Sequence, residues 1–176
     1  FYCSTASNQV DKYVIWNYQE NLWYTGSLDR STWIDSGTYP LPYATKYDGT
    51  NSTLFIHESG KDDDGSTMTS FIESGDFDIG SGDDILFINK VIPDFKGQVG
   101  NVNVSLKSRY FPTDTQTTKG PFRYSTSSTK INTRTRGRQV AVRLESNGFD
   151  DINNDATGED WRLGTIRFEV QPDGKR

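Results

Sequence analysis

The chain has little of the residues that most often carry chemistry. Its 176 residues include one cysteine, Cys3, and one histidine, His57. A single cysteine cannot form an internal disulfide, which excludes a disulfide-stapled secreted scaffold. The chain also lacks an apolar run of 18 residues, so the sequence predicts no membrane-spanning segment. The first residue is Phe rather than Met, and we expect the chain to be part of a longer protein, with a processed N-terminus as the alternative.

Apolar residues are also scarce, at 32% of the chain. Disordered segments share this scarcity but are poor in aromatic residues, which make up 13% here. Short alternations of apolar and polar residues are separated by Ser, Thr, Asn, Asp and Gly, and no segment of 12 residues has a helical period. The sequence therefore predicts an all-β, antiparallel protein with many turns.

The strand patterns divide the chain into two parts. Residues 1–60 contain a predicted hairpin, Asp11–Gly26, whose aromatic-rich arms are typical of β-propeller blade strands. Residues 61–176 are expected to form a C-terminal β-sandwich-like domain. We expect four tryptophans to anchor the sheets: Trp16, Trp23, Trp33 and Trp161.

Proline and glycine set the expected limits of the later strands. An apolar strand is expected to end before Pro93, a loop is expected over Pro112–Tyr124, and Gln171–Gly174 is expected to end the sheet. The apolar positions change from one face to the other near Gly137 and again near Gly164. A strand cannot exchange its faces without an extra residue, so we predict a bulge or a break at both glycines.

One segment runs against the acidic composition of the chain, which has a net charge of -5. Between Thr115 and Leu144 there are seven Lys or Arg residues and no Asp or Glu. Four of these cations share the even positions of a predicted strand: Lys130, Arg134, Arg136 and Arg138. If they share one strand face, they are candidates to contact nucleic-acid phosphates or to form an interface.

An acidic partner for this face exists in the same chain. The stretch Glu58–Asp84 contains nine acids and one lysine, with Asp62, Asp63 and Asp64 in succession. Identical subunits with a basic patch and an acidic patch on different faces can join head to tail into a ring. We therefore expect subunit pairing first and direct contact with DNA second.

Signals for catalysis or cofactors are weak. His57 lies within a predicted strand, where a structural role is the ordinary one, and no serine or cysteine has a nucleophile motif. The clusters Asp62–Gly65 and Asp150–Asp160 have the composition of calcium loops but not the EF-hand spacing. We interpret them as solvated turns and assign no metal, no cofactor and no enzymatic activity.

Several strings of the chain, in order, resemble one phage structural family. They are Asp11–Asp35 (DKYVIWNYQENLWYTGSLDRSTWID), Ser70–Asp84 (SFIESGDFDIGSGDD), Lys90–Phe95 (KVIPDF), YFP and KGPF within Tyr110–Phe122, Arg134–Ser146 (RTRGRQVAVRLES) and Trp161–Arg176 (WRLGTIRFEVQPDGKR). Together they are similar to the C-terminal part of the tail nozzle (tail tubular protein B) family of short-tailed phages, related in role to packaged-DNA stabilisation proteins.

This resemblance implies a virion protein of the phage tail, assembled in the host cytoplasm. Six copies would form a ring below the portal and adaptor, and the ring would hold back packaged double-stranded DNA and conduct it during ejection without sequence specificity. The family offers no catalytic residues to carry over.

Two other classes remain open. A β-sandwich module that binds carbohydrate or a cell-surface receptor would use exposed aromatics such as Tyr39, Tyr43 and Tyr47. A glycan-cleaving depolymerase would need a catalytic Asp or Glu, and the sequence singles none out.

Overall fold

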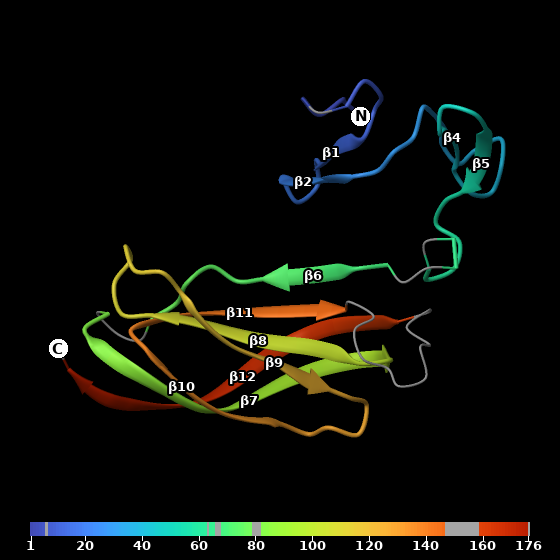
Figure 1. Ribbon diagram of the computed structural model, residues 1–176. Coiled ribbons are helices and arrows are strands. Elements are labelled where there is room, and N and C mark those ends of the chain that lie inside the picture. Colours follow the sequence, from blue (N-terminus) through green and yellow to red (C-terminus); the bar gives the residue numbers. More distant parts are fainter. Residues whose placement is uncertain (6, 63, 66–67, 79–81, 147–158, 176) are drawn as a thin grey trace. The chain divides into compact units, whose positions relative to one another are not determined.

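The computed structural model describes residues 1–5, 7–62, 64–65, 68–78, 82–146 and 159–175 (Figure 1). Every regular element in these ranges is a β-strand and every strand pair is antiparallel, so the all-β prediction is confirmed. The described residues include no helix with the length and apolar character needed to span a bilayer. The chain divides into two compact units, Phe1–Gly60 and Lys61–Arg176.

The first unit contains two small sheets. Strands β1 (Lys12–Asn17) and β2 (Leu22–Ser27) form the predicted hairpin. Strands β3 (Thr32–Ile34), β4 (Tyr43–Tyr47) and β5 (Ser52–Ile56) form a three-stranded sheet in that order. A propeller blade has four strands, and neither sheet has that number, so the propeller stays a prediction.

The tryptophans of the first unit are exposed. Trp16 lies opposite Trp23 in the hairpin, and their rings stack with centroids 5.6 Å apart. The exposed fractions are 52% for Trp16, 65% for Trp23 and 40% for Trp33. The expectation that these three anchor the sheets is wrong. The hairpin that carries Trp16 and Trp23 has no second layer of its own to cover its faces, and Trp33, on β3 of the three-stranded sheet, is also exposed.

The second unit consists of two sheets. The sheet that we call the β8 sheet has the order β6 (Ser70–Glu73), β11 (Gln139–Ser146), β8 (Val102–Arg109), β9 (Thr117–Tyr124). The other, the β7 sheet, has the order β10 (Ile131–Gly137), β7 (Asp84–Val99), β12 (Asp160–Lys175). Figure 1 shows the two sheets as stacked layers.

The core lies between these layers because apolar residues alternate along their strands. On β8 the side chains of Val102, Val104 and Leu106 are fully buried, while the residues between them are partly exposed. They form one cluster with buried residues of the β7 sheet, such as Leu86 and Ile88. Burial of each such side chain stabilises the fold by about 1.5–3 kcal/mol. The β-sandwich-like prediction for this unit is confirmed, and Trp161 packs against this core, as expected.

Strand β7 does not end before Pro93, so that prediction is wrong. The strand continues to Val99 and pairs with β12 over most of its length. Its other neighbour, β10, pairs with β7 only as far as Val91. At Pro93, β7 therefore pairs with β12 only. Proline has no backbone N–H, but on the side of β10 no strand is present to accept a hydrogen bond from this position.

The predicted loop Pro112–Tyr124 and the predicted end at Gln171–Gly174 are also wrong in part. Strand β9 includes Pro121, and β12 includes Pro172 and continues to Lys175. Both are edge strands, and an edge strand tolerates proline because one row of its backbone groups has no strand partner.

The two predicted changes of strand face are confirmed. Strand β10 ends at Gly137 and β11 begins at Gln139 in the other sheet, so the chain crosses between the layers at a bend centred on Arg138. In β12 the register with β7 shifts between Leu163 and Ile166, which is the position of Gly164.

Candidate anion-binding groove

Strand β10 presents cations on one face, as predicted. Thr133, Thr135 and Gly137 are buried, whereas Arg134 and Arg136 are exposed. This alternation follows from the pleat of a strand whose other face packs against the β8 sheet. The two arginines therefore project from the outer side of the sandwich.

The other two predicted cations lie outside the strand. Lys130 is exposed and immediately precedes β10. Arg138 lies in the bend after the strand and is half-buried, and its Nε donates a hydrogen bond to the carbonyl oxygen of Gly82. That bond ties Arg138 to its own chain, so the structure does not place all four cations on one free face.

An open groove of about 510 Å³ lies beside the exposed face of β10. It forms where β10, the edge of the β7 sheet, approaches β8 and β9 of the other sheet. Four cations line the groove: Arg109, Lys119, Arg134 and Arg136. The rest of the lining contains one carboxylate, Asp114, and several hydroxyl-bearing side chains, including Tyr110.

Arg109 is held rigidly at one wall of the groove. Its Nη2 pairs with Asp76, its Nη1 donates to the carbonyl oxygen of Pro112 at 2.6 Å, and its Nε donates to Gln139 at 3.0 Å. Asp76 also accepts a bond of 2.8 Å from Gln116. The charge of Arg109 is therefore balanced by a neighbouring acid, and its position is fixed.

The remaining cations are engaged to different degrees. Arg136 reaches across β7 and forms an ion pair with Asp173 of β12, with 2.6 Å between Nε and Oδ2. The ammonium of Lys119 donates to the carbonyl oxygen of Arg134. Within the described part of the chain, the guanidinium of Arg134 forms no hydrogen bond or ion pair. Arg134 is therefore available to an anion from outside the chain.

Of the four cations that line the groove, the sequence pattern did not indicate Arg109 and Lys119 as candidates. Arg109 lies at the end of β8, before the acid-free segment, and nothing in its sequence surroundings indicates the groove. Lys119 belongs to the acid-free segment but falls in the wrongly predicted loop. Its place in β9 brings it to β10, and only the pairing of strands into two sheets makes that contact.

The acidic candidates are dispersed. Asp62 and Asp64 lie in an exposed turn, and Asp63 lies outside the described residues. Two other acids of the stretch Glu58–Asp84 pair with cations of their own chain: Asp76 with Arg109, and Glu73 with Lys107 and Arg143. Only part of the acidic stretch therefore remains for a neighbouring subunit.

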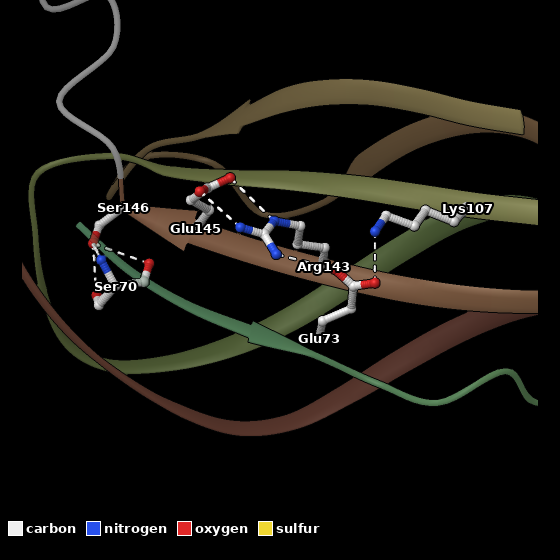
Figure 2. Close-up of polar contacts among 6 residues, drawn as sticks. All are labelled: Ser70, Glu73, Lys107, Arg143, Glu145 and Ser146. Atoms are coloured by element: carbon white, nitrogen blue, oxygen red, sulfur yellow. Dashed lines mark hydrogen bonds and ion pairs between the residues drawn. The ribbon is translucent and has the colours of Figure 1, made fainter. Parts of the chain in front are cut away.

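The outer face of the β8 sheet has balanced charges. Figure 2 shows Glu73 between Lys107 and Arg143, with Glu145 on the other side of Arg143. The bonds from Lys107 and Arg143 lower the pKa of the Glu73 carboxyl. The carboxylates of Glu145 and Glu73 raise the pKa of Arg143. The charges of these two cations and two acids cancel.

The other chemical candidates have structural surroundings. The Nε2 of His57 accepts a hydrogen bond of 3.0 Å from Nε of the buried Arg30, and the imidazole lies 4.7 Å from the ring of Trp33. Among the described residues, no three His, Cys, Asp or Glu side chains lie close enough to hold a metal ion. Most of the second calcium-like cluster, Asp150–Asp160, lies outside the described ranges.

The groove thus combines a fixed arginine, a lysine with spare donors and an arginine whose guanidinium has no partner among the described residues. Guanidinium and ammonium groups in this arrangement bind oxyanions through charge-assisted hydrogen bonds. No protein-family model and no curated protein sequence matches this chain.

Proposed function

We propose that this chain is a virion structural protein of a phage tail nozzle. In this proposal six copies form a ring below the portal and adaptor, and the ring retains packaged DNA and conducts it during ejection. The single observation that carries the proposal is the cationic groove on a chain of net charge -5. The ordered motifs that resemble the tail nozzle family support it.

The chemistry of the groove suits a DNA conduit. Backbone phosphates attract Lys and Arg regardless of base sequence, and this attraction lets proteins move along DNA. The described residues include no helix that could enter a major groove to read bases. Two of the four cations already have acidic partners in the chain, so the attraction is moderate and DNA can pass. The proposal assigns no catalytic step to the chain.

Assembly and location test this function. The protein that contains the chain should elute as a hexamer in size-exclusion chromatography with light scattering, and antibodies against the chain should label the tails of purified particles by electron microscopy. A monomer at micromolar concentration together with unlabelled tails would overturn the proposal. Host-cell fractions before lysis should contain the protein in the cytoplasm.

Exposed aromatics favour a second candidate, a module that binds carbohydrate or a receptor. Besides the exposed stacked pair Trp16 and Trp23, the exposed ring of Tyr39 meets the half-buried ring of Tyr43 edge to face at 5.2 Å. Flat apolar rings beside polar turn residues are suited to stacking on sugars. Binding of the isolated chain to a glycan array, lost in Trp23→Ala, would favour this candidate over the nozzle.

A further inference from the structure

We propose that the groove between β9 and β10 is a binding site for the phosphates of a DNA backbone, with Arg134 and Lys119 as the direct contacts. The choice of DNA as the anion rests on the proposed function. The location of the site rests on the geometry alone. The sequence pattern identified Arg134 as one of four candidate cations but did not identify Lys119.

Arg134 is the strongest contact because it is exposed and its side chain is unpaired within the part of the chain that the structure describes. It stands on the outer face of β10 between the buried Thr133 and Thr135, so the strand itself holds its direction. Its guanidinium has no hydrogen bond or ion pair within the described ranges of the chain. An incoming phosphate therefore displaces only water, and the planar group can bind two phosphate oxygens at once.

Lys119 is placed beside Arg134 by a single bond. Its ammonium donates to the carbonyl oxygen of Arg134, which anchors the long side chain across the gap between β9 and β10. An ammonium has three N–H groups, so donors remain for an anion. The two cations line the same opening, and neither forms an ion pair with an acid among the described residues, although the carboxylate of Asp114 also lines the groove.

The surrounding residues position these contacts. Arg109 is held by Asp76, Pro112 and Gln139 and forms a fixed wall. Tyr110 is 41% exposed and lines the same groove, where its hydroxyl can donate to an anion. A preformed wall reduces the entropy lost when a ligand binds.

The spacing of the cations favours a polymer over a small anion. Arg134 and Arg136 are two residues apart on one face of a strand, which separates their Cα atoms by about 6.6 Å. Lys130 extends the same line beyond the start of β10. Phosphates along a nucleic-acid strand repeat at a comparable interval, whereas a single small anion would use only one of these positions.

Salt dependence of DNA binding tests the proposal. Binding of the complete chain to a labelled 20-base-pair duplex is measured by fluorescence anisotropy between 50 and 200 mM salt. Each phosphate contact contributes about 0.9 to the magnitude of the slope of log K, where K is the association constant, against the logarithm of the salt concentration. One contact therefore changes the affinity by about eightfold for each tenfold change in salt concentration. Arg134→Gln and Lys119→Gln should each lower the slope by about 0.9, and the double variant by about twice that.

Arg162→Gln is the matched control. Arg162 is also exposed on a strand of the β7 sheet, β12. In the strand register Arg162 lies opposite Lys96 of β7, whereas Arg136 of the groove lies opposite Phe87 of the same strand. Nine residues along a strand separate those positions by about 30 Å. The control removes the same charge, so its slope should remain that of the unchanged chain.

The outcomes separate the proposal from the function on which it rests. If Arg134→Gln and the unchanged chain have the same salt slope, the groove is not the DNA-binding site, whether or not the nozzle function holds. Binding to a sulfated polysaccharide but not to DNA would overturn the choice of ligand. A full-length Arg134→Glu protein should keep the assembly state of the unchanged protein while losing DNA. Loss of the ring with DNA binding intact would place Arg134 at the subunit seam and overturn the proposal.

Discussion

Replacing Glu73 with glutamine tests the charge network on the outer face of the β8 sheet. The carboxylate of Glu73 lies 2.5 Å from Nζ of Lys107 and 3.0 Å from Nη1 of Arg143. The side chains of all three residues are between 24% and 29% exposed. Glutamine keeps the shape and one acceptor oxygen but removes the charge that holds both cations.

The size of the effect follows from this partial exposure. An ion pair near the surface stabilises a protein by about 0.2–1 kcal/mol. Two such pairs at Glu73 together contribute about 1 kcal/mol. With an urea m-value of about 2 kcal/mol per molar, Glu73→Gln should lower the midpoint of unfolding by about 0.5 M at pH 7.

The effect should depend on pH with a definite sign. The pKa of Glu73 is lowered from its ordinary value of 4.5, first by Lys107 and then by Arg143. A lowered pKa in the folded state means that this stabilisation is complete above the ordinary value and is lost as pH falls through the folded pKa. The difference between the two proteins should therefore be constant from pH 7 to about pH 5.5 and shrink below about pH 4.5.

The assay needs a signal from the second unit alone. In that unit Trp161 is the only tryptophan, and it packs against the core. Exchange of the exposed Trp16, Trp23 and Trp33 for phenylalanine leaves its fluorescence to report urea unfolding. A midpoint difference for Glu73→Gln that is absent at pH 7, or that stays the same down to pH 3.5, would refute the reasoning.

Two further pairs of substitutions test the core and the crossing between the sheets. Leu106→Ala should lower the free energy of unfolding by about 2–5 kcal/mol because the side chain is fully buried, whereas Leu54→Ala, at a position 63% exposed, should change it by less than about 0.5 kcal/mol; equal melting temperatures for the two variants would contradict this core. Gly137→Ala should destabilise the chain, because a Cβ there would lie 2.9 Å from Cβ of Ser108, whereas Gly164→Ala should be tolerated because its nearest neighbour, a backbone oxygen, would lie at 3.4 Å. Thermal denaturation that orders these two glycine variants the other way would show that the crossing between sheets does not need a glycine.

Local patterns predicted most of the second unit. The alternation of apolar and polar residues along Val102–Leu106 is visible in the sequence and indicates a strand, and so does the alternation along Val140–Leu144; the apolar faces of both strands lie in the core. The breaks at Gly137 and Gly164 were also readable, because a change of apolar phase requires an irregular backbone. Such features depend on neighbouring residues alone, and the sequence contains them completely.

The failures share one cause. Pro93, Pro121 and Pro172 interrupt a strand only if it needs a partner on both sides at that point. Whether a strand lies at an edge is decided by the order in which strands assemble. The three tryptophans of the first unit failed for a related reason, since burial depends on a second layer that no local pattern specifies.

The sequence by itself determined the all-β class, the acid-free segment and the alternation that turns Arg134 and Arg136 to one face. These follow from composition and from the two-residue period of a strand. Only the tertiary structure decided which cations meet and which are neutralised. It gave Arg109, Arg136 and Arg138 partners from distant parts of the chain and brought Lys119 to Arg134. Residues far apart in sequence meet only after the strands have assembled into sheets and the two sheets have packed, so the free charge of the groove is a property of the fold.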